Sequence, residues 1–220
     1  MKFLATLKKG FRENLEREHI ALFFALLGIL LWLLIFDILS KYFAFQNLSA
    51  IPGKAVMDAI PGLFNFVLVG NKGAAWGALR DQKWLLTMVS LLAGTGVLAF
   101  YLFRFARIKR VVSVSLILIV AGAYGNLIDR IGYWAQLGIY KDGVVDFLQF
   151  AFWESFPVFN LADSYLVVGI AILIVYYLVV LIREAIAKNK GTTSGDGNEE
   201  DLSQLVKKTL NKEDDDGKNV

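Results

Sequence analysis

Four long stretches of the chain contain no Asp, Glu, Lys or Arg. They cover residues 20–36, 84–103, 111–128 and 164–182. A helix rises about 1.5 Å per residue, so about 20 residues cross the roughly 30 Å hydrocarbon core of a bilayer. Backbone in lipid must satisfy its hydrogen bonds internally, so runs of this length are expected to be helices. The pattern predicts an all-α membrane protein with four transmembrane helices, at about 20–38, 84–103, 111–129 and 163–182.

Basic residues indicate how these helices are oriented. Lys and Arg gather before the first predicted helix, between the second and third, and after the fourth. Segments rich in Lys and Arg stay in the cytoplasm, so both termini are expected there, and the connections 42–83 and 132–157 face outward. Trp134 and Trp153, in the second of these connections, suit the headgroup layer. The first run is predicted to be a retained anchor, because the apolar region of a cleaved signal peptide has only about 7–15 residues.

The outward connections contain two apolar segments that are too short to span a membrane. Residues 62–70 are rich in β-branched and aromatic side chains with Gly at each end, which is typical of a strand. Residues 144–152 fit a strand, an interfacial helix or the lead into the fourth span. The polar, acidic composition from residue 191 onward predicts disorder. The expected organisation is a cytoplasmic N-terminal segment (1–19), a four-helix membrane domain (20–190) and a disordered cytoplasmic tail (191–220).

Composition supports a membrane protein and excludes several kinds of chemistry. Hydrophobic residues make up 56% of the chain and the mean hydropathy is +0.53, whereas about 45–50% is usual for soluble domains. The net charge of +3 is too small to indicate nucleic-acid binding. The chain has no Cys, and its only His is His19, so thiolate catalysis, a Ser-His-Asp triad and a HExxH zinc site are not expected. We expect no metal and no other cofactor.

Polar residues at the ends of the predicted helices are candidates for function, because burial in lipid makes them costly. Asp37 precedes Lys41 by four residues, so the two can form an ion pair on one helical face, and a simple helix-end pair is the plainest interpretation. Residues 71–77 have the sequence NKGAAWG, whose small side chains allow backbones to approach closely. Taken alone, this segment indicates only a turn.

Two Asn-x-x-Asp units carry more information. Asn126 and Asp129 end the third predicted helix, and Asn160 and Asp163 begin the fourth. Helix capping explains each unit separately. The third helix runs outward and the fourth inward, however, so both units are expected at the same depth. Two neighbouring carboxyls cannot both ionise cheaply, so one can deprotonate water while the other protonates a carbonyl, as in aspartic proteases.

The whole ordered set of motifs resembles one family, the bacterial lipoprotein signal peptidases (signal peptidase II). The set consists of Asp37 with Lys41, then NKGAAWG (71–77), GNLIDR (125–130), VVDF (144–147) and FNLADS (159–164). The resemblance implies a small outward β-cradle above four helices, in the bacterial cell (inner) membrane. It implies an aspartyl endopeptidase that cuts diacylglyceryl-modified prolipoproteins before the lipidated cysteine. The implied inhibitor is the cyclic peptide globomycin, and the enzyme is expected to be a monomer in contact with membrane lipid.

The resemblance also assigns roles to residues. It makes Asp129 and Asp163 the catalytic pair, and Asp37 and Lys41 are expected to help order the outer loop. Arg130 is expected to hold backbone carbonyls rather than to neutralise Asp129. The positions expected to line or brace the site are Asn71, Gly73, Asn126, Arg130, Asp146, Asn160 and Ala162.

Two other classes of function stay open on the residues alone. A small transporter or ion-conducting protein would also carry Asp and Asn in the membrane. Against it, the acids gather near one face and no chain of polar residues continues through the predicted helices. A non-catalytic assembly subunit is the other alternative, and it predicts that both aspartates of the pair tolerate replacement by Asn.

Overall fold

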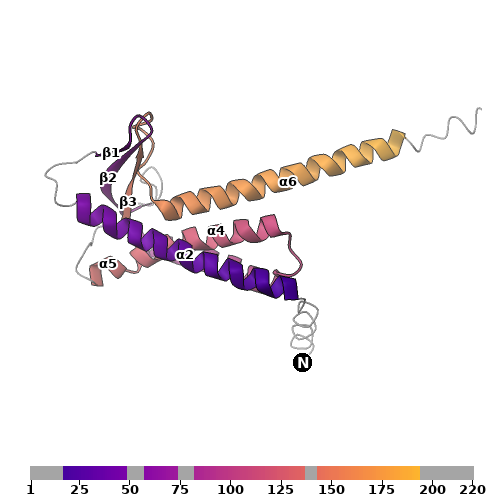
Figure 1. Ribbon diagram of the computed structural model, residues 1–220, viewed down its shortest axis with the longest axis horizontal. Helices are drawn as coiled ribbons and strands as arrows, with labels where there is room; N and C mark the ends of the chain where they lie inside the picture. Colours follow the sequence, from indigo (N-terminus) through magenta and orange to yellow (C-terminus); the bar gives the residue numbers. More distant parts are fainter. Residues whose placement is uncertain (1–16, 49–56, 74–81, 137–142, 194–220) are drawn as a thin grey trace, which may run out of the picture. The chain divides into compact units, whose positions relative to one another are not determined.

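The computed structural model describes residues 17–48, 57–73, 82–136 and 143–193. Within these residues the chain forms four long apolar helices and a small antiparallel sheet, so the expected fold class is confirmed (Figure 1). The elements in order are α2 (Arg17–Leu48), β1 (Met57–Ile60), β2 (Phe64–Asn71), α3 (Lys83–Arg104), α4 (Arg110–Arg130), α5 (Tyr133–Gln136), β3 (Val144–Phe150) and α6 (Leu161–Thr193).

Four helices are long and apolar enough to cross a membrane. They comprise His19–Leu48, Lys83–Arg104, Arg110–Arg130 and Leu161–Lys188. Each contains one of the charge-free runs, but the first and last helices extend well beyond those runs. Helix α2 continues past Phe36 for three further turns, so Asp37 lies inside the helix rather than at its end. The charge-free run underestimated this helix because a buried ion pair can replace apolar side chains.

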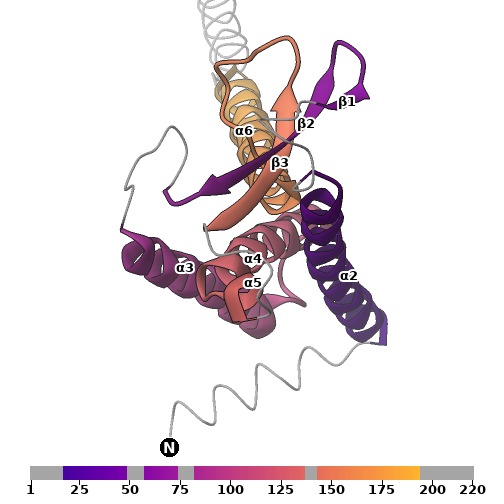
Figure 2. The ribbon, with the colours of Figure 1, turned by 90° about the vertical axis from the view of Figure 1, so that its left-hand side faces the viewer.

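Helix α4 is the central helix of the described bundle. It contacts α2 on one side and α3 on the other, as Figure 2 shows. In its most apolar stretch 67% of the residues are buried, against 17% for α2 and 11% for α3. The other helices expose large apolar side chains such as Trp32 and Leu92. Such extensive apolar surface is expected where lipid, not water, surrounds the helices.

Two glycines allow neighbouring helices to approach α4 closely. A Cβ at Gly125 would lie 2.7 Å from Asp37 Oδ2 and 2.8 Å from Ala162 Cβ. A Cβ at Gly122 would collide with the carbonyl oxygen of Ala162 and lie 2.8 Å from Leu166 Cβ. Any larger residue would push the start of α6 away from α4. Small residues therefore bring the polar ends of α2, α4 and α6 together.

The sheet has the strand order β1-β2-β3, and both pairs are antiparallel. Strand β2 confirms the strand predicted at residues 62–70, and β3 shows which of the three structures residues 144–152 adopt. Strand β1 was not predicted, because it has only four residues and is mostly exposed. The first four residues of β3 are buried, and β3 contacts the ends of α2 and α4. This strand therefore lies against the polar helix ends.

The start of α6 is attached to the sheet before the helix begins. Leu148 and Phe159 form an antiparallel bridge, in which the Leu148 N–H donates to the Phe159 oxygen at 2.8 Å and the Phe159 N–H donates back at 2.9 Å. The rings of Phe150 and Phe159 lie 5.1 Å apart, a distance typical of packed aromatic pairs. The segment before α6 is therefore fixed to β3, and Asn160 follows directly.

Two compact units divide the chain, residues 1–174 and 175–220. Helix α6 begins in the first unit and ends in the second. The predicted N-terminal segment (1–19) and tail (191–220) lie almost wholly outside the described residues. All the candidate site residues belong to the first unit.

Candidate active site

Asp129 is buried near the end of α4 and accepts hydrogen bonds from two neutral donors. Only 2% of the surface of Asp129 is exposed. Trp134 Nε1–H donates to Oδ1 at 2.8 Å, and the Val145 backbone N–H donates to Oδ2 at 3.1 Å. Trp134 reaches back from α5 because the chain reverses at Gly132, whose φ of 88° suits glycine. One carboxylate thus connects α4, α5 and β3.

Lys41 supplies the positive charge next to Asp129. Its Nζ lies 3.0 Å from Asp129 Oδ2 and 2.7 Å from Asp37 Oδ2, and both Lys41 and Asp37 are fully buried. At 3 Å, two unit charges attract by about 5 kcal/mol at an effective dielectric constant of about 20. A charge at a helix end is typically worth only about 0.3–2 kcal/mol. The ion pair with Lys41 is therefore the larger influence on the charge of Asp129.

Asp37 connects this cluster to α6. Its Oδ1 accepts a hydrogen bond from the Ala162 N–H at 3.0 Å, which satisfies one of the free N–H groups at the start of α6. Because Oδ2 of the same carboxylate binds Lys41, one side chain of α2 contacts the groups that position both Asp129 and Asp163. The pairing of Asp37 with Lys41 that the sequence predicted is present. Beyond the expected role in ordering the outer loop, their contacts lead to the two helices that carry the aspartate pair.

The second Asn-x-x-Asp unit forms a capping box at the start of α6. The Asp163 N–H donates to Asn160 Oδ1 at 3.0 Å, and the Asn160 N–H donates to Asp163 Oδ2 at 3.1 Å. This reciprocal arrangement satisfies two backbone donors at a helix start. Asn126 Nδ2 then donates to Asp163 Oδ1 at 2.7 Å. The capping interpretation is therefore confirmed, and the same side chain also faces α4.

Amides connect the two units to each other and to the sheet. Asn160 Nδ2 donates to Asn126 Oδ1 at 3.0 Å and to Asp146 Oδ1 at 2.6 Å. Asn71 Nδ2 donates to Asp146 Oδ2 at 2.9 Å. The Gly73 N–H in turn donates to Asn71 Oδ1 at 2.9 Å, which fixes the orientation of that amide. The expected site positions on β2, β3, α4 and α6 thus form one hydrogen-bonded network.

Asp146 is the third carboxyl of this network, and its environment favours the protonated form. Burial raises the pKa of Asp146 from 3.8 to about 8, and the negative charge of Asp163 acts in the same direction. The amide donors of Asn71 and Asn160 and the charge of Lys41 oppose the shift but are smaller influences. A group that keeps its proton near neutral pH reduces the negative charge that the site must hold.

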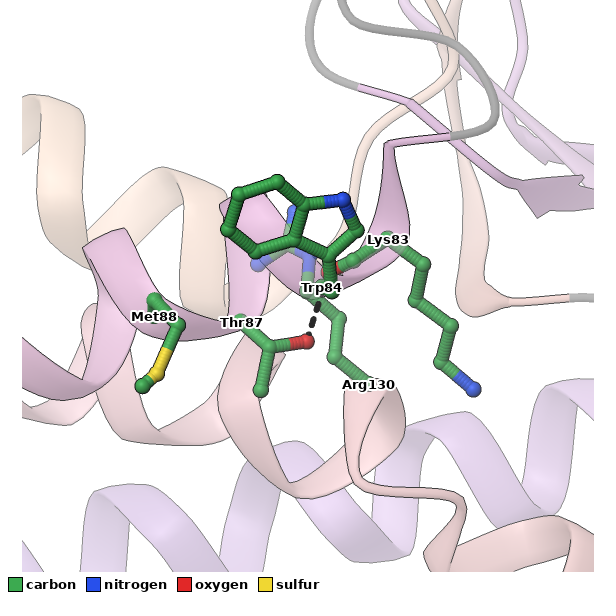
Figure 3. A pocket seen from close by; sticks show the side chains of 5 residues that line it. All are labelled: Lys83, Trp84, Thr87, Met88 and Arg130. Atoms are coloured by element: carbon green, nitrogen blue, oxygen red, sulfur yellow. Dashed lines mark hydrogen bonds between the residues drawn. The ribbon is translucent and has the colours of Figure 1, made fainter.

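Arg130 binds a neighbouring helix. Its Nη1–H donates to the Ser90 hydroxyl on α3 at 3.1 Å, and among the described residues no backbone carbonyl accepts a hydrogen bond from its guanidinium. Its positive charge acts on Asp163, Asp146 and Asp129, although the ion pair of Asp129 is made by Lys41. Beside it opens a pocket of about 530 Å³. Figure 3 shows the lining residues, which are Lys83, Trp84, Thr87, Met88 and Arg130.

Three contributors to the site were missed or misplaced by the sequence. Trp134 was expected in the headgroup layer but is only 4% exposed and binds Asp129, whereas Trp153 is 51% exposed. The donor from Val145 is a backbone group, which leaves no signature in a side-chain pattern. Ser90 lies in the second apolar run, where a Ser is commonplace. The Gly132 turn before Trp134 is the one signal that could have indicated the first of them.

Chemically, the network connects two carboxyls of unequal character, one at the end of α4 and one in the first turn of α6. Asp129 is buried and ion-paired, whereas Asp163 is half-buried and binds neutral donors. Among the described residues no group of three or more His, Cys, Asp or Glu side chains could hold a metal ion. The arrangement suits proton transfer between a water molecule and a substrate group.

Comparison with known proteins finds the family that the sequence motifs resemble. The family described as Signal peptidase (SPase) II matches residues 29–179. A lipoprotein signal peptidase of Listeria welshimeri is 34% identical over 145 residues, which is 65% of this chain and 86% of that protein. One of Burkholderia cenocepacia is 41% identical over 156 residues, which is 68% of this chain and 84% of that protein. The matched stretches cover the bundle and the sheet.

A solved structure has a similar fold. It is a bacterial membrane enzyme determined by the in meso method at 2.3 Å resolution, with a TM-score of 0.60 and 27% sequence identity. The similarity covers 70% of this chain and 87% of that chain. Both kinds of comparison therefore apply to most of the chain, and the family match includes every candidate site residue from Asp37 to Asp163.

Proposed function

The chain belongs to the signal peptidase II family of aspartic peptidases, and from this premise we propose that it cuts diacylglyceryl-modified prolipoproteins before the lipidated cysteine. The family implies prolipoprotein substrates. The observation that carries the proposed chemistry is the 2.7 Å hydrogen bond from Asn126 to Asp163. Since Asn126 and Asp129 are neighbours on one helical face, this bond supports the proposal by joining the face of α4 that carries Asp129 to Asp163 of α6.

One aspartate would act as the general base and the other as the general acid. The ionised carboxyl takes a proton from a water molecule as the water oxygen attacks the scissile carbonyl carbon. The protonated carboxyl gives its proton to the carbonyl oxygen, which forms a neutral tetrahedral intermediate. When the C–N bond breaks, the first carboxyl protonates the leaving nitrogen and the second recovers its proton. The products are the signal peptide with a free carboxyl group and a lipoprotein with a free amino group.

We place both termini in the cytoplasm and the site near the outer face of the membrane. Arg104 ends α3 and Arg110 begins α4, so the short connection between these helices is basic. The positive-inside rule retains such a connection in the cytoplasm. The sheet contacts the opposite end of α4, where the aspartates lie. A prolipoprotein anchored in the membrane would then present its cleavage site at the depth of the aspartate pair.

Globomycin and the monomeric state belong to the same proposal. A cyclic peptide that occupies the position of the substrate would contact the aspartates and the network around them. Four candidate membrane helices and the complete network come from one chain, so a monomer supplies every described residue of the site. Inhibition by globomycin and the mass of the purified enzyme in detergent test these two points.

One experiment tests the central proposal. Purified enzyme is incubated with a diacylglyceryl-modified precursor and with the unmodified precursor, each with and without globomycin, and the products are separated by mass. We expect cleavage of the modified precursor only, directly before the lipidated cysteine, and its loss with globomycin. Equal cleavage of both precursors would contradict the proposed substrate. Proton or cation flux through proteoliposomes without cleavage would favour a transport function instead.

A further inference from the structure

We infer that Lys41 is a positioning residue that holds Asp129 in its ionised form and thereby makes Asp129 the base and Asp163 the acid of the reaction. The inference rests on the proposed function and adds to it, since the family assignment leaves the two roles open. Lys41 lies on α2, away from both Asn-x-x-Asp units in sequence, yet its ammonium lies 3.0 Å from Asp129 Oδ2. It acts on the reaction only through Asp129.

Among the described residues, the partners of Asp129 are all groups that can only donate. An indole N–H, a backbone N–H and an ammonium have no lone pair that could accept a proton from a carboxylic acid. These are the groups of Trp134, Val145 and Lys41 that contact Oδ1 and Oδ2. Protonation of Asp129 would therefore break one of its hydrogen bonds or the ion pair. None of these three partners could accept a hydrogen bond from the new O–H. The surroundings of Asp129 therefore suit a carboxylate.

The surroundings of Asp163 can accommodate its protonated form. Its Oδ1 partner is the side-chain amide of Asn126, which presents its N–H to Asp163. If that amide rotated by half a turn, its oxygen would face Asp163 and accept an O–H. The hydrogen bond from Asn160 Nδ2 to Asn126 would be lost, but the same nitrogen keeps Asp146 Oδ1 as an acceptor. Asp163 also accepts the fixed Asn160 N–H at Oδ2, so it has one fixed donor and one partner of either polarity, whereas all three groups that contact Asp129 are fixed donors.

Without Lys41 the helix ends would favour the opposite assignment. Asp129 is next to last in α4, at the negative end of the helix dipole, which disfavours an anion. Asp163 lies in the first turn of α6, at the positive end, which favours one. A buried contact ion pair outweighs these helix-end effects. Lys41 therefore determines which of the two acids carries the proton.

The other charged groups around the site do not replace this contact. The charged groups near Lys41 and Asp129 are Asp37 from α2, Arg130 from α4, Asp146 from β3 and Asp163 from α6. Arg130 is a second cation near the carboxyls among the described residues, and its Nη1 binds Ser90. Asp37 carries negative charge and disfavours ionisation of Asp129, which makes the ammonium between them necessary.

The absence of cysteine permits a direct test of the charge at position 41. The chain contains no Cys, so Lys41→Cys introduces a unique thiol. Alkylation with 2-bromoethylamine gives a side chain almost as long as lysine that ends in an ammonium. A propyl thioether is the matched neutral side chain. Labelling is followed by intact mass and carried out on partly unfolded protein that is then refolded in detergent, with the wild-type chain as the control for off-target alkylation.

We expect Lys41→Cys to lower kcat by about 100-fold or more, with KM for the diacylglyceryl-modified precursor changed by no more than about threefold. The aminoethyl form is expected to regain about 10-fold or more of the lost kcat. The propyl form is expected to regain none. Equal recovery in both forms, or a Lys41→Cys variant with wild-type kcat, would overturn the inference.

A second variant keeps the test decisive if position 41 cannot be relabelled. Asp37→Asn combined with Lys41→Met replaces the buried pair by neutral side chains, and the amide oxygen introduced at position 37 can still accept the Ala162 N–H. The double variant is expected to fold and to stay slow, and normal kcat in it would overturn the inference. Activity in Asp129→Asn or Asp163→Asn would instead contradict the proposed function. If Asp129→Asn and Asp163→Asn are inactive but a variant with a neutral residue at position 41 is fully active, the inference about Lys41 fails and the proposed function stands.

Discussion

The side-chain amide of Asn126 donates to Asp163 Oδ1 across 2.7 Å, although 37 positions separate the two residues in the chain. Asn126 lies one turn before Asp129 on α4, so this hydrogen bond fixes where Asp163 lies relative to Asp129. Asn160 Nδ2 donates to the oxygen of the same amide at 3.0 Å, so in this structure the amide presents its N–H groups to Asp163. The two Asn-x-x-Asp units are therefore joined by their amides as well as by helix packing.

Asn126→Ala is expected to lower kcat while the protein still folds. The change leaves Oδ1 of the half-buried Asp163 without this donor, a loss of about 1–3 kcal/mol for an unsatisfied group, which corresponds to roughly 5–150-fold in rate if it is felt in the transition state. Steady-state cleavage of a modified precursor measures the effect. Asn47→Ala is the matched control, because Asn47 Nδ2 donates only to the Phe43 carbonyl in an exposed part of α2. Equal activity of both variants would argue against a role for the amide.

Asp129→Asn and Asp163→Asn should each lower kcat by about 100- to 10,000-fold, the usual contribution of a general acid or base. An amide keeps the shape of the carboxyl but cannot take up or release a proton at neutral pH. Asp58→Asn, at an exposed position on β1, makes the same chemical change away from the site and should leave cleavage unchanged. Normal processing by either of the first two variants would mean that the pair is not catalytic.

Asp146→Asn is expected to make the unfolding temperature less dependent on pH. Burial raises the pKa of Asp146 from 3.8 to about 8. A carboxyl whose pKa rises on folding holds its proton more tightly in the folded state. Its stabilising contribution is therefore present at low pH and is lost as the pH rises from 3.8 toward 8. Thermal unfolding in detergent, in steps from about pH 4 to about pH 9, should show a shallower fall for Asp146→Asn than for the wild type.

The control for this measurement is again Asp58→Asn, which should keep the wild-type slope. A slope that Asp146→Asn leaves unchanged would show that this carboxyl does not hold a proton in the folded protein.

Gly125→Ala should destabilise the protein and slow catalysis together. The added Cβ would lie 2.7 Å from Asp37 Oδ2 and 2.8 Å from Ala162 Cβ, so α2 or α6 must move. Overpacking of this kind costs about 1–3 kcal/mol. At Gly96 on α3 nothing lies within 4 Å of the added Cβ, and Gly96→Ala should stabilise its helix by up to about 1 kcal/mol. The unfolding temperature should therefore fall in Gly125→Ala and stay the same or rise in Gly96→Ala. The value of kcat should fall in Gly125→Ala alone.

Arg130→Lys tests whether the guanidinium acts through geometry or through charge. Lys keeps the positive charge near the carboxyls but cannot reproduce the planar arrangement of five N–H donors. If the bond to Ser90 matters, Arg130→Lys and Ser90→Ala should lower kcat by a similar factor, about 10–150-fold for one hydrogen bond to a charged group. Wild-type activity in both would show that charge alone is needed, and a loss in Arg130→Lys alone would indicate another partner in the substrate complex.

Bilayer thickness explains why the four helices could be predicted from the sequence. A run without charges has to be about 20 residues long, and nothing in a soluble protein imposes that length four times. The charge-free rule failed at Asp37, because a side chain with a buried partner does not end a helix. The sheet was predicted only in part. Strand β2 has a β-branched, aromatic pattern, whereas β1 is short and exposed, and the pattern of β3 fits several structures.

The candidate site was predictable where spacing places residues on one helical face, as in the two Asn-x-x-Asp units. Contacts between elements far apart in sequence were not predictable from spacing. The ion pair of Lys41 with Asp129, the indole bond of Trp134 and the capping of α6 by Asp37 all depend on how the helices pack. The capping interpretation of Asp163 does not exclude a catalytic role, because the carboxylate that caps α6 also accepts the Asn126 amide from α4.

The bond from Ala162 to Asp37 has a consequence for biosynthesis, since 125 residues separate its partners. The ribosome delivers the first helix to the membrane long before the last one exists. During that interval Asp37 has Lys41 beside it on the same helix, so the two can enter the bilayer as a neutral pair. The proposed aspartate pair becomes complete only when translation reaches the final helix, because Asp163 lies in its first turn.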